Sequence, residues 1–497
     1  MSARFRIFAF AVGALFMFNL LMWNNIATLW SGGEAALWWA SHRSSNEAGL
    51  PGWWVNRLES PILDLASARW VSGGLLILSL VLFNWMGQKI FSRERVILTL
   101  LVLSSSLLLP VLGKVASADM YLFLAHFGGF LSVVLFLKQD KLEWRIFSSL
   151  LLFMGLWLQP ISTLVFWGVL GIWLWRRHPK ASGSKMLYLA ASAVFMLLFL
   201  WVTGLLDLNP AGYVFSINTL SIGKFVGYSL LGLAPFAGYL LGGLRDNFLF
   251  LKKGEEQAII YTGGLLAGLL AFSLSWQAFL ALLIAKQMTV YFKENYPFHD
   301  WVKTGAILHL LLVFAAAFLL LFNGFIYFEG EGYRAGMAMS GSYWALSFVG
   351  VIGLYGMRRP LALGATLLSG LIGMCFFWIQ LYPLVESKRA TVISAVKEVK
   401  SLVPEPAELL LLPDAKHKFP NVAIFAAPTF DTVLIAPDPG TFSQQLADRQ
   451  NRIGMTKAPS LPFLSAAMSV DTLKTTAWST WMTPVPWFIL NHEAKED

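Results

Sequence analysis

Charged side chains are scarce in this sequence. Only 13% of its 497 residues are charged and 57% are hydrophobic, whereas soluble domains carry about 25% charged residues. A water-soluble fold could not hide so much apolar surface, so this composition excludes a soluble globular protein. The apolar residues recur in stretches of roughly 18 to 25, long enough to cross a hydrocarbon core of about 30 Å. The sequence therefore predicts a polytopic integral membrane protein.

Cysteine is also nearly absent. The one cysteine, Cys375, lies inside an apolar segment, which excludes an intrachain disulfide and a thiolate metal cluster. The sequence lacks a Walker-type phosphate loop, a dinucleotide fingerprint and a His-Glu-x-x-His zinc motif, so neither a soluble nucleotide donor nor zincin-type hydrolysis has support. The net charge of +9 does not indicate a nucleic-acid partner, because basic membrane proteins usually carry their excess in cytoplasmic loops.

We expect about 13 transmembrane helices. Arg4 and Arg6 precede the first, which is interpreted as an uncleaved helix because it is long for a signal peptide and lacks a small-x-small cleavage site. With a cytoplasmic N-terminus, the inside loops carry 19 lysines and arginines and the outside loops before residue 385 carry 6, which supports this orientation. The expected helices lie near residues 7–29, 71–88, 96–113, 118–137, 146–158, 161–175, 186–206, 224–243, 258–274, 276–292, 304–323, 341–357 and 361–384.

The chain divides into two expected domains. Residues 1–384 form the transmembrane domain, with a long outer loop at 31–70 whose tryptophan pairs suggest short interfacial helices. An odd number of crossings places residues 385–497 outside, as a small α/β domain. Within it we expect an amphipathic helix and short strands, at 391–402 and at 408–412, 421–426, 432–436 and 487–490 respectively.

Two carboxylates, Glu34 and Glu59, lie in the outer loop just outside the membrane. A carboxylate there can act as a general base toward an acceptor hydroxyl or amine, or can hold a metal ion. Alternatively, both are hydrated loop carboxylates or the partners of Arg43 and Arg57, and spacing alone favours this second interpretation because most loop charges are solvated.

A second polar cluster, Lys114 and Asp119, lies in the outer turn before the fourth helix. Lys114 could bind a lipid-linked phosphate while Asp119 orients the site, since a phosphate beside lipid requires nearby cations. A local pair between the two that only fixes the turn is an equal alternative. Three further polar positions are assigned no chemistry: Pro160 is expected to break a helix, His126 to bond a neighbouring helix, and Lys286 to extend to the inner surface.

The order of these elements resembles the GT-C glycosyltransferases that use polyprenyl-phosphate sugars, especially the bacterial aminoarabinose transferase and protein mannosyltransferase group. The resemblance covers nearly the whole chain. Gly-Glu-Ala at 33–35 is similar to the family's Asp-Glu-x motif, and Glu-Ser-Pro-Ile-Leu at 59–63 to its Glu-Lys-Pro-Pro-Leu segment. Ala-Arg at 68–69 resembles the arginine before helix two, and residues 114–120 resemble the basic and Thr-Asp-Met segment that opens helix four.

This resemblance implies a transferase at the periplasmic face of a bacterial inner membrane, with a cytoplasmic N-terminus and a periplasmic C-terminal domain. A polyprenyl-phosphate sugar would enter from the bilayer, and outer-face cations would hold its phosphate. Glu34 is the first choice of base and Glu59 the second, and displacement would invert the anomeric carbon. The acceptor could be a lipid, a protein or a glycan, and a divalent metal remains an open question. The expected phosphate-binding residues are Arg69, Lys114 and Lys224, with Asp119 orienting the site.

The sequence departs from the family at two places. Gln159 and Pro160 stand where relatives commonly have Lys-Gly, and Ser-Trp-Gln at 275–277 stands where they often have a basic stretch. Two phosphate contacts are therefore missing. Two other functions stay open: a transporter or flippase of a lipid-linked intermediate, which predicts charges deep in the bundle, and an inactive scaffold subunit of an envelope complex.

Overall fold

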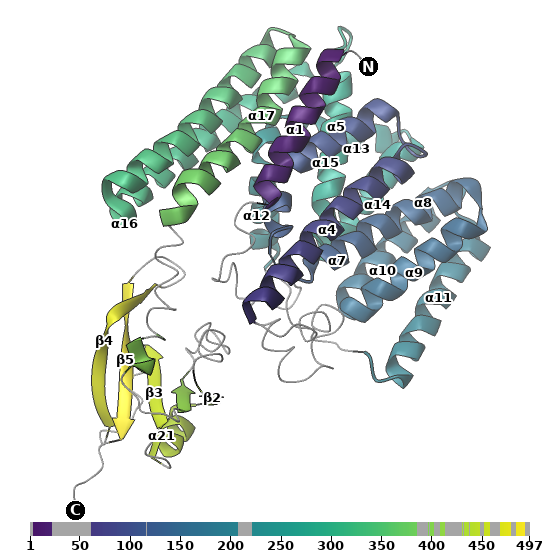
Figure 1. Cartoon of the computed structure of the whole chain (residues 1–497). Coiled ribbons are helices and arrows are strands. Elements are labelled where there is room, and N and C mark those ends of the chain that lie inside the picture. Colours follow the sequence, from purple (N-terminus) through teal and green to yellow (C-terminus); the bar gives the residue numbers. More distant parts are fainter. Residues whose placement is uncertain are drawn as a thin grey trace, which may run out of the picture.

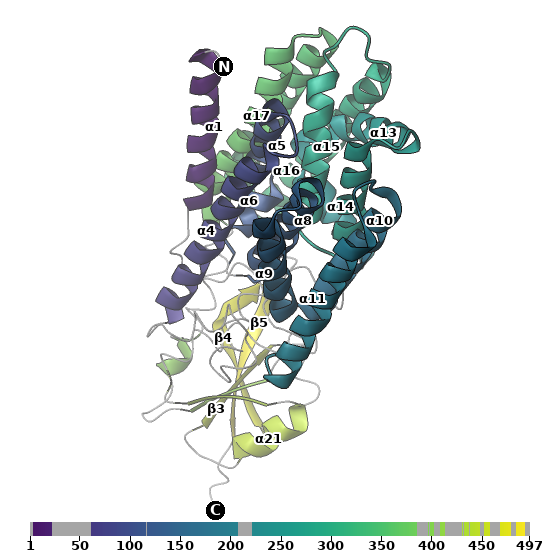
Figure 2. The ribbon, with the colours of Figure 1, turned by 90° about the vertical axis from the view of Figure 1, so that its right-hand side faces the viewer.

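The computed structural model describes residues 3–21, 61–115, 117–206, 221–384, 396, 398–401, 408–412, 430, 432–436, 438–447, 452–457, 468–478 and 484–492. Helices form one large bundle, and a five-stranded sheet lies beyond one end of it (Figures 1 and 2). The helices are α1 (Ala3–Leu21), α4 (Pro61–Gly87), α5 (Arg93–Ser105), α6 (Leu108–Leu112), α7 (Asp119–Phe123), α8 (Gly129–Gln139), α9 (Leu142–Leu158), α10 (Pro160–Arg177), α11 (Gly183–Val202), α12 (Ile222–Gly232), α13 (Ala237–Lys252), α14 (Glu256–Leu270), α15 (Ser275–Val290), α16 (His299–Tyr355) and α17 (Arg359–Phe376).

We call the two ends of the bundle the Lys114 end and the far end. At the Lys114 end, α1 finishes and α4 and α7 begin. At the far end, α1 begins and α10 finishes. The sheet lies beyond the Lys114 end (Figure 1).

Among the described residues, six segments are long and apolar enough to cross a membrane, or seven if α12 and α13, bent by 72°, count as one span. The six are Arg69–Gly87, Asp119–Gln139, Gly183–Val202, His299–Leu319, Gly330–Tyr355 and Arg359–Leu384. The prediction of a polytopic helical membrane protein is confirmed.

The longest helix, α16, turns back on itself. It comprises 57 residues, yet the rings of His309 and Tyr343 lie 6.3 Å apart and those of Phe314 and Trp344 lie 6.5 Å apart. A straight helix would separate His309 from Tyr343 by about 50 Å. The chain therefore reverses within α16, so its two halves correspond to the two helices expected at 304–323 and 341–357.

Three of the differences from the expected boundaries have an identifiable cause. Helix α4 begins at Pro61, ten residues before the expected start, because proline suits the first helical position. The helix expected at 96–113 breaks after Ser105, and the amide of Leu107 donates instead to the Gly232 carbonyl at 2.7 Å. The helix expected at 224–243 bends at the 3₁₀ turn η2 (Ala234–Phe236), where Pro235 lacks an amide proton.

The core centres on α15, in which every residue from Ser275 to Met288 is buried. Helices α5, α13 and α14 pack against it. Glycines allow close approach at the crossing of α13 and α16, where a Cβ on Gly305 would collide with the backbone carbonyl of Gly238. Helix α11, by contrast, lies at the margin, with 6% of its spanning window buried.

The C-terminal sheet has the order β2-β1-β3-β5-β4. The strands are β1 (Glu408–Leu411), β2 (Thr432–Ile435), β3 (Arg452–Lys457), β4 (Met468–Trp478) and β5 (Pro484–His492), with helix α21 (Pro439–Ala447) between β2 and β3. Strand β1 pairs in parallel with β2 and β3, whereas β5 pairs antiparallel with β3 and β4. The strands at 408–412, 432–436 and 487–490 were expected; β3 and β4 were not. The strand expected at 421–426 lies outside the described residues, as does most of the helix expected at 391–402.

Candidate functional site

Lys114 is completely buried at the Lys114 end of the bundle. It follows α6 in the turn that leads to α7, and its Nζ donates a hydrogen bond to the Asn19 carbonyl of α1 at 2.8 Å. The same nitrogen lies 4.0 Å from the centre of the Trp378 ring, close enough for a cation–π interaction. A backbone carbonyl and an indole face thus both contact the cation.

The helices around Lys114 are fixed by contacts of their own. The Asn19 amide donates to the Leu371 carbonyl of α17 at 3.2 Å, which joins α1 to α17. Trp378 lies on the π turn η3 (Phe377–Leu381), which follows α17, and its ring packs 5.2 Å from that of Tyr382. Such turns re-aim side chains at functional positions of helices. Gly113 packs closely beside Lys114, since a Cβ there would lie 2.7 Å from the side chain of Leu76, which would have to shift.

Arg69 brings a second cation to this region. It lies on α4 and is also fully buried. The pKa of Lys114 is lowered to about 7, chiefly by burial and secondarily by the positive charge of Arg69. Two neighbouring buried cations repel each other and lose hydration. Binding of an anion such as a phosphate between them is therefore favourable.

The other predicted site residues are placed differently. Asp119 is buried and is the first residue of α7, where its negative charge interacts favourably with the positive end of the helix dipole. Lys224 lies exposed on α12, and no contact joins it to the two buried cations within the part of the chain that the structure describes. Glu34 and Glu59 lie outside the described residues, so their convergence on one cavity stays a prediction.

The positions that depart from the family offer no cation. Gln159 is buried between α9 and α10, and Pro160 occupies the first position of α10, as the interpretation of Pro160 as a helix breaker predicted. Trp276 packs on Phe225 at 5.6 Å, and the Gln277 amide donates to a carbonyl of α12 at 3.2 Å. These neutral side chains fill the core where relatives often carry basic ones.

His126 contacts both α10 and the turn between α14 and α15. It lies on the π turn η1 (Leu124–Gly128) between α7 and α8, 2.8 Å from the Ser273 hydroxyl through Nδ1 and 3.1 Å from the Thr163 hydroxyl through Nε2. Its ring stacks on Phe166 at 4.3 Å. The expectation that His126 bonds a neighbouring helix is confirmed, and the residue has a structural role.

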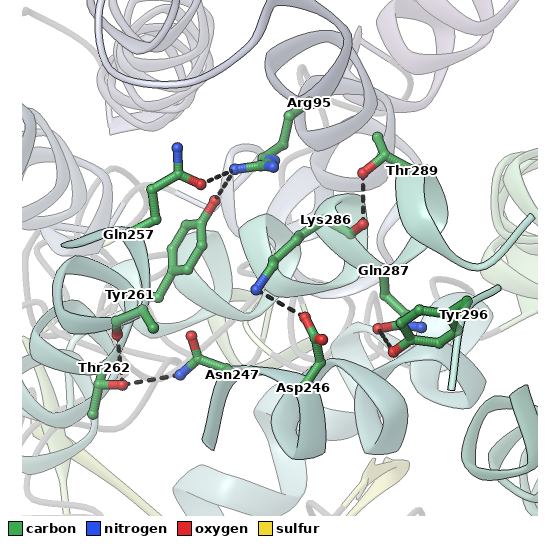
Figure 3. Close-up of polar contacts among 11 residues, drawn as sticks. Arg95, Asp246, Asn247, Gln257, Tyr261, Thr262, Lys286, Gln287, Thr289 and Tyr296 are labelled. Atoms are coloured by element: carbon green, nitrogen blue, oxygen red, sulfur yellow. Dashed lines mark hydrogen bonds and ion pairs between the residues drawn. The ribbon is translucent and has the colours of Figure 1, made fainter. Parts of the chain in front are cut away.

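A buried ion pair joins α13 and α15 (Figure 3). Lys286 on α15 approaches Asp246 on α13 to 2.8 Å, and their side chains are only 9% and 3% exposed. The expectation that Lys286 extends to the inner surface is therefore wrong: its partner is inside the protein. The pairing could not be recognised from spacing, because the two residues are 40 positions apart on separate helices.

Further hydrogen bonds surround this ion pair and join α5, α13, α14 and α15 (Figure 3). They reach from the start of α5 to the segment after α15. The pairs are Arg95 with Gln257 and Tyr261, Asn247 with Thr262, and Gln287 with Tyr296. Because every bond crosses between helices or segments, this cluster fixes how the far end is packed.

Asp246→Asn is expected to destabilise the protein by about 3–5 kcal/mol, because it leaves Lys286 as an uncompensated buried cation. Thermal unfolding in detergent measures the change. Asp300→Asn, at an exposed carboxylate in the first turn of α16, serves as control and should cost under about 1 kcal/mol. Replacing both partners, Asp246→Leu with Lys286→Met, should recover most of the loss. Equal melting temperatures for Asp246→Asn and Asp300→Asn would contradict the assigned role of the pair.

The chain was compared with protein families, curated proteins and solved structures. No protein-family model matches the chain, and no curated protein matches it. Solved structures do match, and two of them are forms of ArnT. The apo form of ArnT from Cupriavidus metallidurans aligns with a TM-score of 0.63 over 97% of each chain, at 11% sequence identity. The form of ArnT bound to undecaprenyl phosphate aligns with a TM-score of 0.60 over 98% of each chain, at 12% identity. The resemblance indicated by the sequence is thus confirmed at the level of the fold: the chain has a fold similar to that of ArnT.

Proposed function

We propose that this protein is a glycosyltransferase that moves a sugar from a polyprenyl-phosphate donor to a lipid, protein or glycan acceptor. The observation that carries the proposal is the pair of buried cations, Lys114 and Arg69, at one end of the membrane bundle. A similar fold that binds undecaprenyl phosphate supports a polyprenyl-phosphate ligand. Neither support identifies the sugar or the acceptor.

The burial of Lys114 argues for function over stability. An apolar side chain of similar length would fill the same space without the desolvation that lowers the lysine pKa to about 7. Proteins retain such costly groups where a ligand needs them. A phosphate that reaches Lys114 and Arg69 would receive two charge-assisted contacts, which are stronger than neutral hydrogen bonds.

The proposed reaction is an inverting displacement. Glu34, or Glu59 as second choice, takes a proton from the acceptor hydroxyl or amine while the acceptor attacks the anomeric carbon. The bond from that carbon to the phosphate oxygen breaks, and polyprenyl phosphate leaves with the electron pair. Lys114 and Arg69 stabilise the negative charge that develops on the leaving oxygen, and Asp119 orients the site. Lys224 is exposed, so it would contribute to phosphate binding only at the edge of the site.

The membrane arrangement that goes with this proposal has a cytoplasmic N-terminus and about 13 crossings of a bacterial inner membrane. It requires shorter helices such as α9, α14 and α15 to cross as well; 15 to 17 residues span about 22–26 Å. Residues 1–384 would form the transmembrane domain. Residues 385–497 would form a periplasmic domain on the same side as Lys114.

The proposal is tested by transfer in proteoliposomes from a panel of radiolabelled polyprenyl-phosphate sugars to membrane extract. Labelled product that depends on the protein supports the transferase, and its loss on adding EDTA would identify a divalent metal requirement. Among the described residues, no three histidine, cysteine, aspartate or glutamate side chains converge on a metal position. Absence of both transfer and donor binding would favour the inactive scaffold instead.

Binding of undecaprenyl phosphate is expected to weaken by about tenfold between pH 7 and pH 8.5. Lys114 has a pKa of about 7 in the free protein, so it loses its charge over this range, whereas a bound phosphate holds the proton on the lysine. The second ionisation of the phosphate, near pH 6, is almost complete at pH 7. Titration in detergent at several pH values measures the effect.

The matched variant for this titration is Lys114→Gln, which should bind weakly with little dependence on pH over the same range. A flat profile for the wild type would show that Lys114 does not hold the phosphate. A loss of affinity with rising pH is specific to Lys114, because protein carboxylates and the phosphate are already ionised above pH 7 and contribute little change in affinity.

A flippase of a lipid-linked intermediate is the second candidate, and two observations favour it. The buried pair of Asp246 and Lys286 places charges inside the bundle, and α12 and α13 form a span bent by 72°. Transporters commonly have both features. A transbilayer assay with a fluorescent polyprenyl phosphate distinguishes them: a flippase would move the lipid without any acceptor, whereas the transferase would not.

A further inference from the structure

Helices α10 and α11 are consecutive but leave an open groove between them. The groove has a volume of about 450 Å³, within the usual range of roughly 300–1,000 Å³ for ligand sites. Its lining is almost entirely apolar, with Trp167 and Leu170 from α10, Met186 and Ala190 from α11, and Val133 from α8 beneath. It runs along most of α10, from Leu164 to Trp175, a length of about 16 Å.

Two glycines on α10 help to make this space. Gly168 and Gly171 line the groove, and a Cβ added to either would meet no atom within 4 Å. Glycines in membrane helices usually allow a neighbour to pack closely, as Gly129 does here, where a Cβ would lie 2.6 Å from Trp167. Since no atom of the described residues fills the space beside Gly168 and Gly171, hydrocarbon from outside the bundle fits there.

A cluster of basic residues lies next to the end of the groove that is lined by Trp175 and Gly183. Arg176, Arg177 and Lys180 are exposed around the turn between α10 and α11, and none has a carboxylate within 4 Å in the described part of the chain. The nearby carboxylates already have partners: Asp140 binds Arg145 and Lys185, and Glu256 binds Lys138 and His178. The mouth of the groove is therefore positively charged.

We propose that this groove binds an anionic glycerophospholipid, with one acyl chain between α10 and α11 and the phosphate against Arg176, Arg177 and Lys180. Basic pockets between membrane helices favour anionic headgroups, and the exposed Trp175 suits the interface between headgroups and chains. Helix α11 already packs on α9, and the lipid would fill the space that remains between α11 and α10. The proposed donor phosphate site lies at the opposite end, so this site does not depend on sugar transfer.

Native mass spectrometry of the whole protein tests the proposal, with phosphatidylglycerol and phosphatidylcholine of identical chains added in equal amounts. Wild type should retain phosphatidylglycerol at least fivefold more than phosphatidylcholine. Gly171→Leu, which fills the groove without a backbone clash, should retain neither. The double variant Arg176→Gln/Arg177→Gln should retain both equally, because only the charge preference is removed.

The matched control is Gly13→Leu on α1, another exposed glycine with no atom within 4 Å of an added Cβ, which should behave like wild type. Equal retention of the two lipids by wild type would overturn the proposal, as would full retention by Gly171→Leu. Displacement of phosphatidylglycerol by added undecaprenyl phosphate, lost in Gly171→Leu, would also overturn it by assigning the groove to a polyprenyl chain. If Gly171→Leu fails to fold, the arginine variant still decides, because its substitutions lie on the surface.

Discussion

Glu34→Gln is expected to lower the rate of sugar transfer by about 10²–10⁴-fold, the usual contribution of a general base. Glutamine keeps the size of the side chain but cannot accept the acceptor's proton. Binding of undecaprenyl phosphate should stay unchanged, because the proposed phosphate contacts are Lys114 and Arg69. The measurement compares initial transfer rates in proteoliposomes with donor-lipid binding in the same preparation.

Glu59→Gln is the natural comparison for this experiment. A loss of transfer confined to Glu59→Gln would exchange the roles of the two carboxylates and leave the reaction intact. Normal transfer by both variants would contradict a carboxylate base in the 31–70 loop. Glu34 and Glu59 would then be the hydrated loop carboxylates that their spacing alone favours.

Lys114→Gln is expected to weaken binding of undecaprenyl phosphate by about 10- to 100-fold, because a hydrogen bond to a charged group contributes about 1.5–3 kcal/mol. The variant removes the charge and keeps a side chain long enough to fill most of the space beside Trp378. Lys224→Gln is the matched control, since Lys224 is exposed on α12. It should change affinity less than threefold. Similar losses in both variants would indicate nonspecific attraction.

Lys114→Gln should also raise the melting temperature of the protein. The pKa of Lys114 is about 7 in the folded protein and 10.5 in its unperturbed form, so the unfolded state binds more protons between these values. The stability of the wild type therefore increases as pH rises above 7. Lys114→Gln lacks this dependence, and its advantage should be largest at or below pH 7. A lower melting temperature for Lys114→Gln would show that Lys114 stabilises the fold.

Hydropathy predicted the helical segments well because lipid requires long apolar runs that satisfy their own backbone hydrogen bonds. Boundaries within those runs were harder to place. Pro235 was a visible signal for the bend between α12 and α13, yet the run around it is apolar throughout. The break after Ser105 had a weaker signal, since serine hydroxyls that bond back to the preceding turn often leave a helix intact.

Some residues of the candidate site could be predicted from the sequence and others could not. Lys114 and Arg69 could be predicted because cations beside long apolar runs are unusual and the resemblance supplied an order of motifs. Asn19 and Trp378 could not, because they come from α1 and from the segment after α17, far apart in sequence, and meet only through tertiary packing. The pair of Asp246 and Lys286 did have a signal: Lys286 is the single ionisable residue of α15 and Asp246 the single acidic residue of α13, and ionisable residues in apolar helices usually require partners.

The central claim is that Lys114 and Arg69 hold the phosphate of a lipid-linked donor. The most direct measurement is a structure of this protein with undecaprenyl phosphate bound. We expect a phosphate oxygen about 2.7–2.9 Å from Lys114 Nζ, with a second oxygen in contact with the Arg69 guanidinium. A phosphate bound at the far end, beside Arg176 and Arg177, with no ligand near Lys114, would contradict it.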